Sequence, residues 1–134
     1  MLNSNTIETT FKTLTNWQDR YRQLILLAKT LPEYPNDLKT PENQITGCEN
    51  LAWLSGHKNN QGKLHFVAES EGRIIKGLMA VLLAYINNKT AKEIKEMNLF
   101  EIFKQLKIVD ELSDSRQLGL KNILTKAQAI AKNG

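Results

Sequence analysis

The residue of this 134-residue chain best suited to chemistry is its only cysteine, Cys48. It follows Gly47 in the turn-prone stretch PENQITGCENLAW, which runs from Pro41 to Trp53. Because glycine adopts positive φ angles and has no side chain, the backbone can bend at Gly47 and a partner can approach closely. The stretch predicts a thiol near a loop tip before a strand, with Gly47 as the loop hinge. The alternative is a buried structural cysteine, which is common for unpaired thiols.

A nucleophilic role for Cys48 requires the thiolate, because the thiolate and not the thiol attacks sulfur. An ordinary thiol has a pKa of about 8.5, so only a small fraction is ionised at neutral pH. The adjacent Glu49 carboxylate opposes ionisation. Arg116, Arg73 or a helix N-terminus at Ser70 would favour the thiolate if the fold brings one of them near.

Metal chemistry has weaker support in the sequence. His57 and His65 can share one face of a hairpin, but a structural zinc site needs four protein ligands and a catalytic site usually needs three. The chain has no CxxC or HxxxH spacing. Iron–sulfur scaffolds hold their clusters with several cysteines, and this chain has one. We therefore expect no metal and no other cofactor.

Nucleic-acid binding is also not indicated. The lysines of residues 89–126 are interleaved with glutamates and aspartates, and no basic stripe with interspersed aromatic residues is present. The chain contains neither GxxxxGK[ST] nor GxGxxG, so no nucleotide-binding loop is predicted. We expect a mixed-charge solvated surface instead.

Composition indicates one ordinary globular domain over residues 1–134. The chain is 41% hydrophobic and 24% charged, with a formal net charge of +4 and a pI near 9.2. The longest apolar run, residues 78–86, is far shorter than the ~18 residues needed to span a bilayer. The first twelve residues do not resemble a signal peptide, and a single thiol suits a reducing compartment. We expect a cytoplasmic protein without membrane association.

The N-terminal third predicts two helices. Residues 1–6 are polar and are expected to be disordered. A short helix is predicted over residues 7–14, and a longer one over residues 17–31 that ends before Pro32. Thr15 and Gln18 have the spacing of a capping box for the longer helix. The prolines that follow predict an extended connection leading to Cys48.

A β-hairpin is predicted next, with strands over residues 51–57 and 63–68. In the expected register His57 faces Lys63 and Leu54 faces Phe66. The predicted core face of the hairpin comprises Ala52, Leu54, Leu64, Phe66 and Ala68. A third strand near Ile45 is possible, and helices must back so small a sheet.

The remaining chain is predicted to be helical. A helix over residues 73–86 is apolar on nearly all sides, which is typical of a central helix, and Ser70 is its expected N-cap. Thr90 and Glu93 form a capping box for a short helix, and another short helix covers residues 99–106. The last helix begins at Ser113 or Ser115. We therefore expect an α+β fold with a small antiparallel sheet packed with several helices.

Three sequence motifs together resemble the SufE family of sulfur acceptors for cysteine desulfurases. They are Pro41-x-Asn43-x-Ile45-x-Gly47-Cys48 with Trp53 beyond it, Ser70-Glu71-Gly72-Arg73-Ile74-Ile75-Lys76-Gly77-Leu78, and Ser115-Arg116-x-x-Gly119-Leu120. The pair Glu49-Asn50 is more similar to the CsdE branch than to SufE itself. Departures from the commoner family pattern at Asn50, Leu51 and Ala52 bear on which desulfurase is the partner.

The resemblance implies a SufE-like fold, related to iron–sulfur scaffolds, and a role for Cys48 as persulfide acceptor. The implied partners are a PLP-dependent cysteine desulfurase, which the protein would stimulate, and a downstream sulfur acceptor protein. The protein would be an accessory to the desulfurase and not itself an enzyme. Arg116 is the candidate for thiolate or partner contact. The residues expected to contact a partner are Ile45, Glu49, Asn50, Trp53 and Arg73. The alternative is a non-catalytic adaptor with a structural cysteine.

Overall fold

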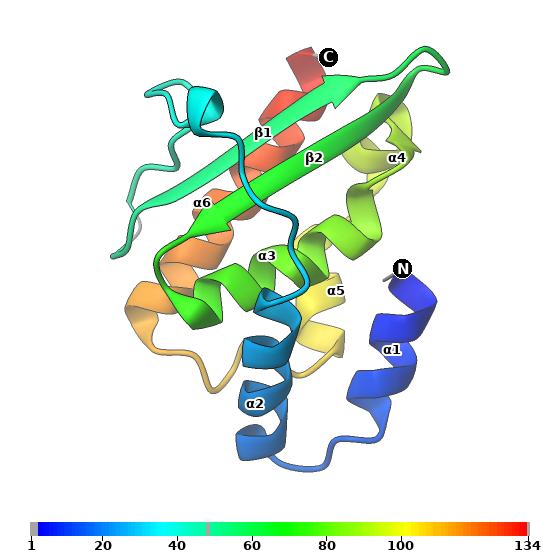
Figure 1. Ribbon diagram of the computed structural model, residues 1–134. Coiled ribbons are helices and arrows are strands. Elements are labelled where there is room, and N and C mark those ends of the chain that lie inside the picture. Colours follow the sequence, from blue (N-terminus) through cyan, green and yellow to red (C-terminus); the bar gives the residue numbers. More distant parts are fainter. Residues whose placement is uncertain (1–2, 48, 134) are drawn as a thin grey trace.

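A computed structural model describes residues 3–47 and 49–133, and these form a small antiparallel sheet packed with helices (Figure 1). The sheet has the strand order β1-β2-β3. Its strands are β1 (Ala52–Lys58), β2 (Lys63–Ser70) and β3 (Lys89–Thr90). The helices are α1 (Ser4–Lys12), α2 (Trp17–Ala28), α3 (Arg73–Ile86), α4 (Ala91–Glu96), α5 (Leu99–Gln105) and α6 (Asp114–Asn133), with a 3₁₀ turn at Asn36–Leu38. The predicted α+β class is confirmed.

The core lies between the sheet and the two longest helices. In Figure 1, α3 and α6 lie behind β1 and β2, and the chain between α2 and β1 crosses in front. The predicted core face of the hairpin is buried, together with nearly all of α3. Helices α2 and α3 cross closely at Gly77, where a Cβ would lie only 2.7 Å from the backbone carbon of Leu24. A side chain at this position would separate the two helices.

The hairpin register differs from the predicted one by two residues. His57 pairs with His65 and Leu54 with Ala68. The reason is a tight turn: Asn59 Oδ1 accepts the amides of Gln61 (2.9 Å) and Lys63 (3.0 Å). Gly62 follows with φ of 78°, the left-handed conformation typical of a three-residue hairpin loop. Because the shift is an even number of residues, the core face is unchanged.

The third strand also differs from the expectation. β3 pairs with β2 at the far edge of the sheet, whereas the stretch near Ile45 contributes one isolated bridge between Gln44 and Trp53. Two hydrogen bonds flank this bridge, from Ile45 N to Ala52 O and from Leu54 N to Asn43 O, both 2.9 Å.

Side-chain caps set several helix starts differently from the sequence prediction. α1 begins at Ser4 because Asn3 Oδ1 accepts the amide of Thr6 (2.9 Å), so residues 3–6 are ordered into the helix cap and first turn. The first two residues lie outside the described part of the chain. α2 is capped by Asn16, which accepts the Asp19 amide, and not by Thr15. The Thr90–Glu93 capping box is confirmed, and accepting the Thr90 amide lowers the pKa of Glu93.

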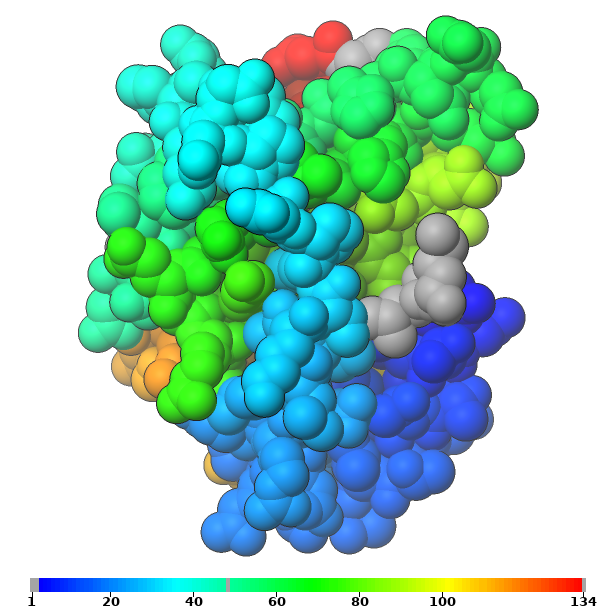
Figure 2. All heavy atoms as spheres, viewed as in Figure 1, coloured from blue at the N-terminus to red at the C-terminus, as the bar shows by residue number. Residues whose placement is uncertain are grey.

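The segment that leads to the cysteine covers part of the outer face of the hairpin, where His57 and His65 stay exposed. Figure 2 shows this segment lying over the strands. Tyr34 is buried within it and donates to Leu38 O (3.0 Å), and burial raises the pKa of its phenol. Further along, Lys39 Nζ lies 5.1 Å from the Trp53 ring centroid. Trp53 is therefore partly covered by its own chain.

Candidate functional site

The loop around position 48 is closed at its base by the pairing of residues 43–45 with residues 52–54. Ile45 is only 4% exposed and anchors the loop in the hydrophobic core. Beyond this anchor Thr46, Gly47 and the segment 49–51 are exposed, and Leu51 is 44% exposed. Cys48 itself lies outside the described residues. The described flanks of the only thiol therefore form an exposed loop with a buried anchor.

Helix α6 holds the loop through three polar side chains. Ser115 Oγ donates to Glu49 Oε2 (3.1 Å), Asn122 lies against Gly47, and Lys126 Nζ donates to Glu42 O. Because Ser115, Asn122 and Lys126 are separated by seven and four residues, they share one face of the helix. Gly47 has φ of +79°, and a Cβ on it would meet the Asn122 amide. Glycine is therefore required at position 47 for both backbone and packing reasons.

The start of α3 holds the other side of the loop. Ser70 Oγ donates to Leu51 O (3.0 Å) and accepts the Gly72 amide (3.1 Å). The Ser70 side chain is thus buried with both hydrogen-bonding functions used, and it is not the N-cap of α3, which is Gly72. Asn50 lies over Gly72, where its Nδ2 is 2.6 Å from the position of a Cβ. A side chain on Gly72 would push Asn50 away.

The two candidate arginines belong to different helices, Arg116 to α6 and Arg73 to α3. The Arg116 guanidinium is 5.8 Å from the ring centroid of Tyr21, so its described contact is with α2. Its neighbour Ser115 faces the loop instead. Arg73 is exposed in the first turn of α3. The roles predicted for Arg116 and Arg73 stay predictions.

The predicted partner-contact residues differ in their exposure. Glu49, Asn50 and Arg73 are exposed, and Trp53 is partly exposed beneath Lys39. Ile45 is buried, so in this structure its side chain positions the loop and offers no contact surface. The partner contacts predicted for Ile45, Glu49, Asn50, Trp53 and Arg73 stay predictions.

The two histidines do share a face of the hairpin. The rings of His57 and His65 lie opposite each other across β1 and β2, with centroids 5.5 Å apart. Within the described ranges, no group of three or more His, Cys, Asp or Glu side chains is placed to hold a metal ion. Among the same residues, no helix combines the length and the hydrophobicity needed to cross a membrane.

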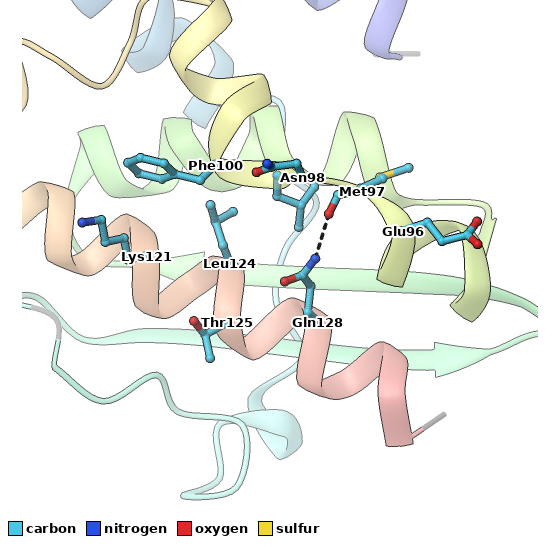
Figure 3. A pocket seen from close by; sticks show the side chains of 9 residues that line it. Glu96, Met97, Asn98, Phe100, Lys121, Leu124, Thr125 and Gln128 are labelled. Carbon is cyan, nitrogen blue, oxygen red and sulfur yellow. Dashed lines mark hydrogen bonds between the residues drawn. The ribbon is translucent and has the colours of Figure 1, made fainter.

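Two hollows lie away from the loop. The larger, about 600 Å³, is an open groove between α6 and the α4–α5 connection (Figure 3). Gln128 Nε2 donates to Met97 O (3.0 Å) across this groove. The smaller, about 340 Å³, lies between α1, α3 and α5. At its wall Tyr85 donates to Glu8 (3.1 Å), and burial, with help from Glu8, raises the pKa of the Tyr85 phenol.

Comparison with known proteins identifies the family of the chain. Residues 5–131 match the SufE family, described as an Fe-S metabolism associated domain. The chain belongs to the SufE family. The sulfur acceptor protein CsdE of Escherichia coli (strain K12) is 45% identical over 124 residues, which cover 92% of this chain and 84% of that protein. The expected CsdE-like branch of the SufE family is thereby confirmed.

Other SufE relatives agree with this placement. An uncharacterized SufE-like protein of Rhizobium etli is 37% identical, over 91% of this chain and 84% of its own length. A second, from Rhizobium meliloti, is 35% identical, over 91% of this chain and 89% of its own. A solution structure of a hypothetical protein from Thermus thermophilus has the same fold, with a TM-score of 0.78. It is 15% identical, over 99% of this chain and 97% of that one.

The sequence analysis missed two residues of the site, Asn122 and Lys126. Neither belongs to a matched motif, and both reach the loop across more than 70 residues of sequence. Their seven- and four-residue spacing from Ser115 is a usable signal once Ser115 is known to face the loop.

Proposed function

We propose that this protein is a sulfur acceptor that receives persulfide sulfur on Cys48 from a PLP-dependent cysteine desulfurase. Membership of the SufE family and the 45% identity to CsdE support this role. The observation that carries it is the convergence of three separated segments on one loop: Ser115 reaches Glu49, and Ser70 reaches Leu51, on either side of the only cysteine. A carrier needs one accessible thiol on a defined loop.

The transfer is a thiol exchange without net oxidation. The Cys48 thiolate attacks the outer sulfur of the donor cysteine persulfide, and the bond between the two donor sulfurs breaks. The donor leaves as a thiolate with that electron pair, and Cys48 holds the new persulfide. A downstream acceptor thiolate then repeats the exchange on the outer sulfur and releases the Cys48 thiolate. The pyridoxal phosphate acts in the partner, which forms the persulfide.

The residues flanking Cys48 would act by positioning it and by meeting the partner. Gly47, with its positive φ, is the hinge that lets the loop rearrange when the partner binds. Glu49, Asn50 and Trp53 would contact the desulfurase, with Arg73 beside them at the start of α3. Arg116 would contact the partner or stabilise the thiolate. We further propose that the protein stimulates the desulfurase in the cytoplasm and supplies sulfur to iron–sulfur cluster assembly or another sulfur-transfer pathway.

Mass spectrometry of the intact protein tests this proposal. After incubation with a purified cysteine desulfurase and cysteine, we expect an added mass of about 32 Da, one sulfur atom, that a reducing thiol removes. Cys48→Ser should gain no mass and should unfold at the wild-type denaturant concentration. If Cys48→Ser is instead strongly destabilised while the wild type gains no sulfur, Cys48 is structural and the protein is an adaptor.

A further inference from the structure

The net positive charge of the chain is concentrated in its last helix. Residues 1–114 hold fourteen basic and fourteen acidic residues, and residues 115–134 hold four basic and no acidic ones. The formal net charge of +4 is therefore the charge of the final twenty residues. The four cations are Arg116, Lys121, Lys126 and Lys132. The two ion pairs found in the described part of the chain, Arg22–Asp19 and Lys76–Glu69, do not involve them.

Three of these cations, Lys121, Lys126 and Lys132, border a neutral strip on the outer face of α6, whereas Arg116 lies against Tyr21 of α2. We define the α6 strip as Leu118, Asn122, Thr125 and Ala129, which lie four, three and four residues apart and so share one face. Leu118 is 53% exposed, the most exposed large apolar side chain described. Thr125 and Ala129 are also exposed. An apolar residue within a polar, charged rim is the usual arrangement of a protein-binding surface.

Lysines border the strip on both sides. Lys121 lies on the groove side, where its Nζ is 5.2 Å from the Phe100 ring centroid, and Lys132, three turns further along, shares its helix face. Figure 3 shows Lys121 extending from α6 toward Phe100, while Thr125 projects away from that ring. Lys126 lies on the opposite side and donates to Glu42 O. The Phe100 contact favours a fixed position for the Lys121 ammonium beside the strip.

The strip is continuous with the cysteine loop. Asn122 belongs to the strip and lies against Gly47, and Ser115, one turn before Leu118, is bonded to Glu49. A protein that reaches the loop from the side of α6 must therefore cover Leu118. Asp114 lies one turn before Leu118, and every charged side chain of α6 beyond it is a cation, so an acidic covering surface matches the greater part of the strip.

We infer that the α6 strip and its lysines dock an acidic surface of the cysteine desulfurase beside the desulfurase's active cysteine. This inference rests on the proposed function and adds the surface through which the protein binds the desulfurase. The lysines would accelerate and orient the encounter, and Leu118 would supply apolar contact in the docked complex. Charge on α6 then sets which desulfurase loads Cys48.

The test compares two double charge reversals of equal size. Lys121→Glu/Lys132→Glu changes the border of the strip, and Lys12→Glu/Lys104→Glu changes two exposed lysines on α1 and α5. Binding is measured to the purified desulfurase that loads Cys48, at low salt and at about 0.5 M salt. We expect the α6 variant to bind about tenfold more weakly at low salt, with much of the difference lost at high salt, and the control to stay within about twofold.

Leu118→Ala provides a second, uncharged variant. We expect it to bind several-fold more weakly at both salt concentrations, because it removes apolar contact and no charge. Equal weakening by both double reversals, or none by either, overturns the inference. It is also overturned if the α6 reversal abolishes binding to an RNA oligonucleotide while desulfurase affinity is unchanged. If wild-type Cys48 gains no sulfur from any desulfurase, the proposed function itself fails, which is a separate outcome.

Discussion

The turn between β1 and β2 and the loop between Ile45 and Ala52 both join antiparallel segments, and each contains a glycine with φ close to +78°, Gly62 and Gly47. The turn is closed by its own residues, because Asn59 Oδ1 binds amides two and four positions ahead. The cysteine loop is held by Ser115 and Asn122 of α6 and by Ser70 of the β2–α3 junction, which lie 19 to 75 residues away from their partners in the loop. A loop held by remote contacts can exchange them for those of a partner, which a self-contained turn cannot do.

The two glycines give the largest expected difference. Gly47→Ala places a Cβ against Asn122 at a strained φ, whereas among the described residues nothing lies within 4 Å of a Cβ on Gly62. We expect Gly47→Ala to slow sulfur loading of Cys48 at least about tenfold and to cost about 2–3 kcal/mol of stability. Gly62→Ala should cost about 1–2 kcal/mol and leave loading unchanged. Intact mass against time and denaturant melts measure the two effects.

Adding Asn122→Ala to Gly47→Ala separates the two causes. The double variant removes the steric contact and keeps the backbone strain. Partial recovery of loading would assign part of the effect to Asn122. If Gly62→Ala slows loading as much as Gly47→Ala does, the distinction between the two regions is wrong.

Ser70→Ala is expected to have the next largest effect on stability. The hydroxyl is buried and serves both Leu51 O and the Gly72 amide, so its removal leaves two polar groups without that partner. We expect a loss of about 2 kcal/mol in denaturant melts. Sulfur loading should slow as well, because Ser70 fixes the end of the loop. Ser55→Ala, on the outer face of β1, is the matched control and should change neither quantity appreciably.

Asn59→Ala should lower stability by about 1 kcal/mol, because two turn amides lose their acceptor. Sulfur loading should equal that of the wild type, since the turn is at the opposite end of β1 from the loop. Ser115→Ala is the counterpart: it should change stability by less than about 0.5 kcal/mol but alter the loading rate. If Asn59→Ala and Ser115→Ala each changed stability and sulfur loading together, the turn and the cysteine loop would not differ in the way described.

The smallest expected effect is the pH dependence of stability that comes from the Thr90–Glu93 capping box of α4. Accepting the Thr90 amide lowers the pKa of Glu93, so this contact stabilises the fold above the ordinary glutamate pKa. The stabilisation is lost as pH falls through the lowered pKa. The difference in melting temperature between wild type and Glu93→Gln should therefore be present near pH 7 and shrink as the pH falls below the ordinary glutamate pKa. A difference that grows on acidification would mean that another group is responsible.

The same contrast explains which features the sequence could predict. The bounds of α3, the Thr90–Glu93 capping box and the buried face of the hairpin depend on short-range patterns, and all three were predicted correctly. The hairpin register was predicted wrongly because the Asn59 side chain tightens the turn, which residue types alone do not reveal. Ser70 was wrongly predicted as the N-cap of α3. Its hydroxyl bonds instead to Leu51 O, nineteen positions away, and a local pattern cannot indicate such a contact.

The position of the candidate site in the chain could be predicted from the sequence, but the residues of α6 that hold its loop could not. The lone cysteine after a glycine and the three motifs indicated the loop around residues 45–51. Asn122 and Lys126 were not indicated, because their relation to the loop depends on how α6 packs against β1. Packing between distant elements is a property of the whole fold, and no local pattern encodes it.

The bridge between Gln44 and Trp53 has a consequence for self-association. An open strand edge is a template on which a second chain can add, and this leads to aggregation. At the β1 edge, Leu54 N donates to Asn43 O and Ala52 O accepts from Ile45 N, so these outward backbone groups are already hydrogen-bonded. At the other side of the sheet, Asn87 Oδ1 accepts the Phe66 amide (2.7 Å). The segment that leads to Cys48 thus also shields the first half of β1. A partner that displaced this segment entirely would expose unpaired backbone groups of β1, on which a second chain could add. We therefore expect the loop to rearrange on partner binding while residues 43–45 stay paired with β1.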